Sequence, residues 1–243
     1  MAMTELRTAI PEEIDRYLDS LVSTGPFSSK AELVRAALAA YTSMAGPMAQ
    51  VFDKDNIYSP DGRVYQMDYA RESALRGPTV VGITYQGGVL LACKIACPSP
   101  LMEYSKIERV SSNLTACPTG VRADGYMAIR TLRKNPPKTL ADLIDSLTVF
   151  FWENNTDKRR RPLGTILLIA ALLEGKPSLV MFEPSGAHVL GKAIAIGKGY
   201  QRAQANLNLS YRSGTAKEAE NLAIDILGKL EKTEKYEIVH LKR

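Results

Sequence analysis

The stretch YSPDGRVYQMDYARESALRG, residues Tyr58–Gly77, is the most informative part of this chain, because a turn and a helix follow each other without a spare residue. Ser59-Pro60-Asp61-Gly62 has the composition of a β-turn, since proline pre-sets φ and glycine accepts a positive φ. Asp68–Arg76 then has the pattern of one short helix, and Gly77 is a typical helix terminator. These residues predict a turn and a helix that lead into a folded domain.

Paired apolar runs follow this stretch. Val80–Ile83 and Val89–Ile95 flank a Gly87-Gly88 turn, and Gly164–Leu173 precedes Ser178–Phe182, which indicates antiparallel hairpins. Helical patterns lie between and after the hairpins, before a last strand near Ile238-Val239, at residues 122–133, 139–152, 200–209 and 216–230. Paired strands and paired helices predict an α+β fold, a four-layer α/β/β/α sandwich.

The composition is that of an ordinary globular protein. The chain has 243 residues, of which 45% are hydrophobic and 23% charged, enough for a sizeable core in one or two domains. Its three cysteines and two histidines predict neither a disulfide framework nor a metal site, and we expect no cofactor. The basic run Lys158–Arg161 is interpreted as a solvated loop. Because the sequence shows no signal peptide and no transmembrane run, we expect a cytoplasmic location.

Further motifs lie along the second half of the chain, namely Ile107-Glu108-Arg109, Arg161-Pro162-Leu163-Gly164, Phe182-Glu183-Pro184-Ser185-Gly186 and Ala195-Ile196-Gly197-Lys198-Gly199. Together with Tyr58–Gly77, in this order and spacing, they resemble α-type proteasome subunits over residues 51–243. The resemblance implies the sandwich fold of the Ntn hydrolases, a role in protein degradation, and a proteasome-like domain at residues 57–243.

The family that the chain resembles contains both catalytic and non-catalytic members. Catalytic β-type subunits use an N-terminal threonine whose own amine serves as base, tuned by a lysine and an aspartate. When the chain is aligned on Val81-Gly82-Ile83, Pro78 takes the place of that threonine, Lys94 that of the aspartate and Arg109 that of the lysine. Proline has no hydroxyl, and arginine keeps its proton at any working pH. We therefore predict that the chain is not an enzyme; the competing hypothesis is a hydrolase that cuts itself before Thr79.

The same positions have another role in α-type subunits. The resemblance implies that seven chains form a ring capping the rings of β-type subunits, and that a pocket between neighbours receives the C-terminal tail of an activating ATPase. Arg109 matches the cation of this pocket, normally lysine, and Gly77 and Gly120 match glycines that line it. Arginine binds a carboxylate bidentately, so the replacement keeps the chemistry. The simpler interpretation is that Arg109 ends a strand and pairs with Glu108.

The segment before the turn matches the gate of the α-type ring. The Tyr-Asp-Arg triplet of the family appears here as Phe52-Asp53-Lys54, with one residue fewer before Ser59. The charges are kept, but the tyrosine hydroxyl is lost and with it one hydrogen-bonding group of the gate. We assign residues 45–56 to a linker that contains this gate-like segment.

Residues 1–44 precede the region of resemblance and have the pattern strand, helix, Gly25-Pro26 turn, helix. Apolar residues form one stripe on each expected helix, at Ile14, Leu18, Leu21 and Val22 and at Leu33, Val34, Ala37, Leu38 and Tyr41. This pattern resembles a ribbon-helix-helix domain, in which two chains pair their strands. One strand and two short helices cannot bury a core alone, so we expect this domain to dimerise.

Ribbon-helix-helix strands often enter the major groove of DNA. Alternation along the strand places Glu5, Arg7 and Ala9 on the outer face, which offers one cation opposed by one carboxylate. The domain as a whole is acidic, which disfavours phosphate contact. A DNA-binding regulator that uses the proteasome-like domain for oligomerisation or sensing is therefore kept as the alternative to a docking subunit.

N-terminal domains that pair in twos conflict with a ring of seven chains, because seven domains cannot all be paired within one ring. Either two rings are joined through paired N-terminal domains, or the chain forms a small even-numbered oligomer. The sequence does not decide between these assemblies.

Overall fold

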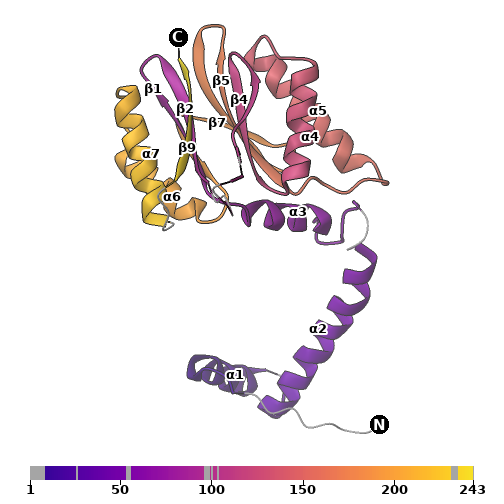
Figure 1. Cartoon of the computed structure of the whole chain (residues 1–243). Coiled ribbons are helices and arrows are strands. Elements are labelled where there is room, and N and C mark those ends of the chain that lie inside the picture. Colours follow the sequence, from indigo (N-terminus) through magenta and orange to yellow (C-terminus); the bar gives the residue numbers. More distant parts are fainter. Residues whose placement is uncertain are drawn as a thin grey trace. The chain divides into compact units, whose positions relative to one another are not determined.

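The computed structural model divides the chain into two compact units, Met1–Lys54 and Asp55–Arg243. It describes residues 9–25, 27–52, 56–95, 99, 101–102, 104–230 and 235–242, and of residues 42–52 it describes the backbone only. The two units are described separately below (Figure 1).

The larger unit consists of two antiparallel sheets between two pairs of helices (Figure 1). Its elements in chain order are α3 (Tyr65–Leu75), β1 (Val80–Tyr85), β2 (Gly88–Lys94), β3 (Glu108–Ser111), β4 (Leu114–Gly120), α4 (Arg122–Lys134), α5 (Leu140–Thr156), β5 (Thr165–Leu173), β6 (Lys176–Phe182), β7 (His188–Gly191), β8 (Ala193–Ile196), α6 (Tyr200–Ser210), α7 (Ala216–Leu230) and β9 (Tyr236–Lys242). One sheet has the order β8-β1-β2-β9 and is covered by α6 and α7. The other has the order β3-β4-β5-β6-β7 and is covered by α4 and α5. The predicted four-layer α/β/β/α sandwich is confirmed.

Strand β5 shows why the sequence specifies these layers. Ile166 and Leu168 belong to the core between the two sheets, whereas Leu167 and Ile169 belong to the core under α4 and α5. Successive side chains of a strand point to opposite faces, so a strand buried on both faces needs an apolar residue at every position. The continuous apolar run of β5 is the result.

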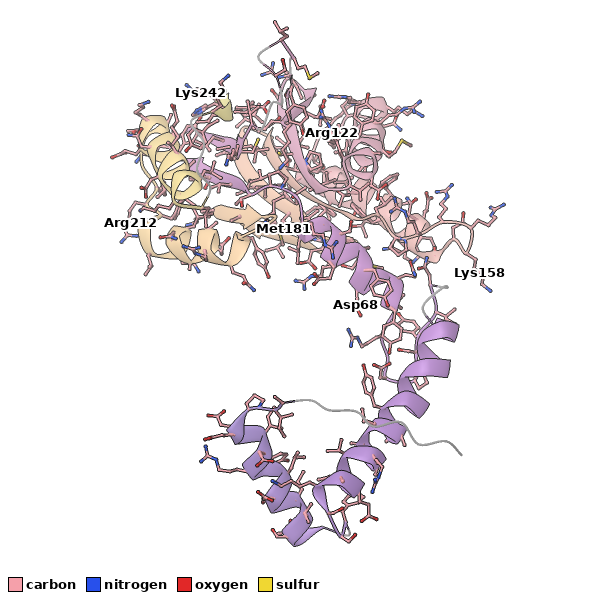
Figure 2. The ribbon with its side chains drawn as sticks, turned by 60° about the horizontal axis from the view of Figure 1, so that its bottom comes forward. Asp68, Arg122, Lys158, Met181, Arg212 and Lys242 are labelled. Atoms are coloured by element: carbon pink, nitrogen blue, oxygen red, sulfur yellow. The ribbon has the colours of Figure 1, made fainter. Side chains whose placement is uncertain are left out.

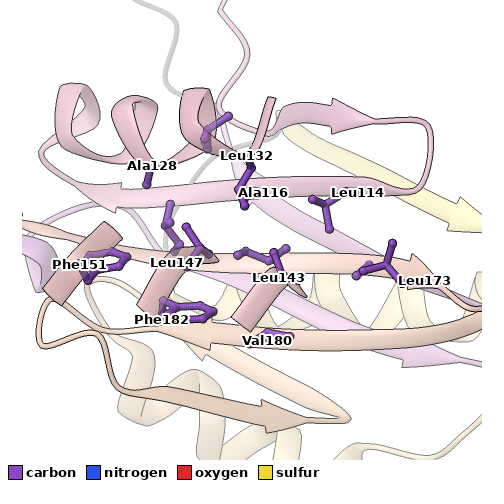
Figure 3. Packing of buried hydrophobic residues seen from close by; sticks show 14 of the residues in the cluster. Leu114, Ala116, Ala128, Leu132, Leu143, Leu147, Phe151, Leu173, Val180 and Phe182 are labelled. Atoms are coloured by element: carbon purple, nitrogen blue, oxygen red, sulfur yellow. The ribbon is translucent and has the colours of Figure 1, made fainter. Parts of the chain in front are cut away.

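Helix α5 packs on the second sheet through one side. Leu143, Leu147 and Phe151 are spaced four residues apart and are fully buried, and Figure 3 shows them pointing at the strands. The ring of Phe151 stacks on that of Phe182 in β6, with centroids 6.2 Å apart. Helix and sheet are therefore held by large side chains in direct contact.

The turn predicted at Ser59–Gly62 is present. The Gly62 amide donates to the Ser59 carbonyl at 2.8 Å, and Gly62 has a φ of 78°, in the region that favours glycine. The following helix begins at Tyr65 rather than at Asp68. The Arg63 guanidinium pairs with the Asp68 carboxylate at 2.7 Å, and this ion pair joins the turn to the first turn of α3.

Four strands have no clear pattern in the sequence. Strands β7 and β8 have four residues each, too few for a period-2 pattern. Strand β4 contains Pro118, a residue that argues against a strand, and β3 is a short edge strand next to it. Pairing with the apolar strand β5 places β4 in the sheet despite this proline.

The smaller unit contains α1 (Glu12–Thr24) and α2 (Lys30–Phe52). The Lys30 ammonium lies 2.7 Å from Asp15 and 2.8 Å from Asp19, so an ion pair joins the two helices. The hydrogen bond with Asp15, followed by that with Asp19, raises the pKa of Lys30 above its ordinary value. No residue of α1 is buried.

The expected ribbon falls mostly outside the described residues, which include neither Glu5 nor Arg7. Ala9 is described and belongs to no helix or strand. The helices lie where the sequence predicts them, and the ribbon-helix-helix fold itself stays a prediction.

Helix α2 runs further than the sequence suggests. It continues through Gly46 and Pro47 to Phe52, so the first part of the predicted linker, residues 45–56, has a helical backbone. Alanine and methionine have high helix propensity, and they surround the two unfavourable residues on both sides. Among the helices that the structure describes, none combines the length and the hydropathy needed to cross a membrane.

Candidate functional site

The candidate site is the junction between α3 and β1, where Gly77 and Pro78 connect the helix to the first sheet. Gly77 is buried, and a Cβ atom there would collide with Thr119 Oγ1 and the Gly120 amide. Only glycine fits this close approach. The end of α3 is thus fixed against the end of β4, although the two elements are far apart in sequence.

Two side chains hold the Pro78 carbonyl. Lys106 Nζ donates to it at 3.0 Å and Thr119 Oγ1 donates to it at 3.2 Å. Lys106 is 5% exposed, although lysine is rarely buried to this extent. The buried ammonium therefore contacts a backbone carbonyl at the position where the sequence alignment places a catalytic threonine.

The loop between β8 and α6 also holds the junction at Gly77 and Pro78 in place. The Lys198 amide donates to the Gly77 carbonyl at 2.7 Å, and the Thr79 hydroxyl donates to the Lys198 carbonyl. Thr79 is 1% exposed. Its hydroxyl is engaged with the backbone, and Thr79 directly precedes β1.

Glu237 of β9 fixes the segment that carries Lys106. Its carboxylate accepts hydrogen bonds from the Lys106 amide at 2.7 Å, from the Ile107 amide at 3.3 Å and from the Ser105 hydroxyl at 2.5 Å. Hydrogen bonds to a charged acceptor are among the stronger ones in proteins. Glu237 is a positioning residue, because its hydrogen bonds fix the backbone from which the Lys106 side chain extends.

The structure places Lys106, and not Arg109, beside Pro78. Arg109 is exposed on the edge strand β3, and Lys94, the residue aligned with the catalytic aspartate, is half-buried at the end of β2. The sequence interpretation missed Lys106 because residues 96–106 contain no periodic pattern, so spacing across this stretch is not fixed by motif.

The motif at Arg161–Gly164 forms a second fixed point. The Asp124 carboxylate accepts from the Arg161 guanidinium at 2.7 and 3.0 Å and from the Gly164 amide at 2.8 Å. The hydrogen bond with Asp124 raises the pKa of Arg161. Arg161 is thus tied to α4, whereas Lys158, in the same basic run, lies on the outer edge of the larger unit (Figure 2).

The sequence was compared with protein families and with known proteins. The proteasome subunit family matches residues 74–242, which is more than half of the chain. The chain belongs to the proteasome subunit family.

Similar proteins are named as alpha subunits. The proteasome subunit alpha of Thermococcus kodakarensis is 35% identical over 186 residues, which cover 71% of this chain and 71% of the relative. That of Pyrococcus abyssi is 34% identical over 186 residues, with the same coverage of both chains. The proteasome subunit alpha 2 of Haloarcula marismortui is 32% identical over 184 residues, covering 70% and 75%.

The expected docking residues of this proteasome-family chain lie on separate elements. Gly77 and Gly120 are in contact, and Gly120 has a φ of 93°, at which any side chain is strained. Arg109 is exposed and is not paired with Glu108, whose carboxylate lies 2.8 Å from Arg133 and 3.6 Å from Arg122. The expected pairing of Arg109 with Glu108 is therefore wrong within the described residues, although Arg109 does lie in a strand, β3.

The gate-like triplet is described only in part. Phe52 is the last residue of α2 and is described by its backbone, while Asp53 and Lys54 lie outside the described residues.

The two donors to the Pro78 carbonyl make a prediction for stability. Lys106→Met and Thr119→Val each leave one donor in place, whereas the double variant leaves this carbonyl without either. A fully buried acceptor without a partner costs about 1–3 kcal/mol, and this carbonyl is only part-buried, so we expect the double variant to lose more stability than the sum of the single variants by about 1 kcal/mol. Urea unfolding followed by circular dichroism measures these differences.

The control pairs Thr119→Val with Lys134→Met. Lys134 is exposed on α4, so this double variant should be additive. Additivity in both cycles would show that the two hydrogen bonds do not act on one shared acceptor.

Proposed function

We propose that the chain is a non-catalytic α-type proteasome subunit that assembles with copies of itself and docks protein partners. The observation that carries this proposal is Pro78. It stands in the place of the nucleophile, it has no hydroxyl, and its carbonyl is bound by Lys106 and Thr119. An N-terminal nucleophile needs a hydroxyl or thiol next to a free amine, and residue 78 supplies neither within an intact chain.

The family relationship supports assembly with related subunits. The relatives are alpha subunits, so β-type subunits and an activating ATPase are the partners we propose. We propose Arg109, Gly77 and Gly120 as the residues that receive the C-terminal carboxylate of such a partner. The exposed guanidinium of Arg109 supports this, because arginine binds carboxylates bidentately. From the same family relationship we also propose a cytoplasmic location.

We further propose that the N-terminal unit pairs two subunits. Large apolar side chains on both helices face solvent, including Ile14 at 48%, Leu38 at 47% and Tyr41 at 70% exposure. Exposed apolar side chains grouped on two helices favour burial against a second copy. The DNA-binding alternative loses support, because Lys30, one of the few cations of this unit, is already neutralised by Asp15 and Asp19.

The docking proposal predicts dependence on a free carboxylate. A peptide from the C-terminus of a candidate ATPase should bind at least about tenfold more tightly than its C-terminally amidated form, because a hydrogen-bonded ion pair is lost in the latter. Arg109→Gln should remove this difference, and Arg109→Lys should keep most of it. Fluorescence anisotropy with labelled peptides measures both affinities.

The matched control for docking is Arg130→Gln, since Arg130 is exposed on α4 and is not part of the proposed pocket. It should retain the preference for the free carboxylate. Equal affinity of both peptides for the unaltered protein would contradict the docking proposal.

The pairing proposal predicts a difference between two neighbouring alanines of α2. Ala37 lies on the stripe with Leu33, Val34, Leu38 and Tyr41, and Ala39 lies on the opposite side of the helix. Ala37→Glu should halve the mass of the assembly measured by light scattering, because it places a charge in the paired face. Ala39→Glu should leave the mass unchanged.

Both variants introduce the same residue into the same helix. If they change the mass equally, or not at all, pairing through this face is contradicted.

A further inference from the structure

A basic cavity lies beside the Pro78 junction, in the larger unit. Its volume is about 520 Å³. The residues that line it come from the end of α3, the start of α6 and the end of α7, and they are Arg76, Pro78, Lys198, Gly199, Arg202 and Leu230. Pro78 is the residue aligned with the nucleophile, whereas the cations of the lining, Arg76, Lys198 and Arg202, take no part in the proposed docking or pairing.

Among the described residues, the lining contains three cations, Arg76, Lys198 and Arg202, and no acidic residue. In the part of the chain that the structure describes, none of the three side chains forms an ion pair. Other arginines of this unit do pair with carboxylates, at Arg63, Arg71, Arg122, Arg133 and Arg161. Three like charges around one cavity repel each other, and an anion between them removes that repulsion.

The frame of the cavity is rigid. The backbone of Lys198 is held at both ends, because its amide donates to the Gly77 carbonyl and its carbonyl accepts from the Thr79 hydroxyl. Arg202 stands in the first turn of α6, where the helix dipole adds partial positive charge. The cations therefore project from fixed backbone positions, which lowers the entropy lost when they bind a common ligand.

We propose that this cavity binds a small anion with two or more linked phosphate groups. Guanidinium groups bind phosphate oxygens bidentately, and three cations match several phosphate charges better than a single carboxylate. A cavity of about 520 Å³ is much larger than one phosphate, and Leu230 supplies an apolar wall for the remainder of a ligand. The inference does not depend on the proposed docking or pairing, because it uses other side chains.

The test is calorimetric titration of the full-length protein with tripolyphosphate at low salt. We expect saturable binding that weakens as salt is added, as an ionic site should. ATP serves as the second probe, and tighter binding of ATP than of tripolyphosphate identifies the ligand as a nucleotide. Equal affinities identify the phosphate chain as the recognised group, and both results support the site. Citrate is the carboxylate control, and citrate binding as tightly as tripolyphosphate overturns the preference for phosphate.

A matched pair of variants locates the binding. Arg202→Glu should weaken tripolyphosphate at least about tenfold, whereas Arg130→Glu, the same change on an exposed arginine of α4, should leave the affinity within about twofold. Lys198→Ala is a second variant of the site, and its affinity for tripolyphosphate should fall several-fold. Circular dichroism verifies that each variant is folded. Absence of saturable binding to the unaltered protein, or equal weakening by Arg202→Glu and Arg130→Glu, overturns the proposal.

Discussion

The hydrogen bonds to the Pro78 carbonyl are the interaction on which the larger unit depends. Lys106, just before β3, and Thr119, near the end of β4, both donate to this one oxygen, and β3 and β4 belong to the second sheet. Pro78 itself leads into β1 of the first sheet. The two sheets are therefore joined by polar contacts at one end, while the core between them is apolar.

The glycines around this oxygen explain why the junction tolerates little change. Gly77 leaves no room for a Cβ atom, and Gly197, with a φ of 85°, would place one against the Pro78 carbonyl. Buried lysine is expensive unless its protons find acceptors, and a carbonyl in this position supplies one. The Pro78 carbonyl is held by a buried ammonium and packed against glycines.

The fold could be predicted to a large extent because its signals are local. The apolar run of β5 and the spacing of Leu143 and Leu147 follow from side-chain periodicity. The turn at Ser59–Gly62 follows from the backbone preferences of proline and glycine. Strands β7 and β8 could not be found in this way, because each has only four residues, and β8 in addition pairs with β1, which is distant in sequence.

The site was less accessible to sequence reasoning than the fold. The proposed placement of Pro78 at the nucleophile position follows from the short motif Val81-Gly82-Ile83. Lys106 does not, because its role depends on contacts with Glu237 and Pro78, which lie more than a hundred residues and 28 residues away along the chain, respectively. The basic cavity likewise combines the ends of three helices, α3, α6 and α7, and the sequence shows only the Gly197-Lys198-Gly199 loop among its parts.

The most direct measurement is the intact mass of the purified protein, taken by mass spectrometry after incubation under conditions that permit self-processing. The junction at Pro78 is interpreted as a structural connection, so a single uncut chain of 26.6 kDa is expected. A shorter chain that begins at Thr79 would carry a free amine beside a hydroxyl, and it would contradict the proposal that this proteasome-family chain has no nucleophile at this position.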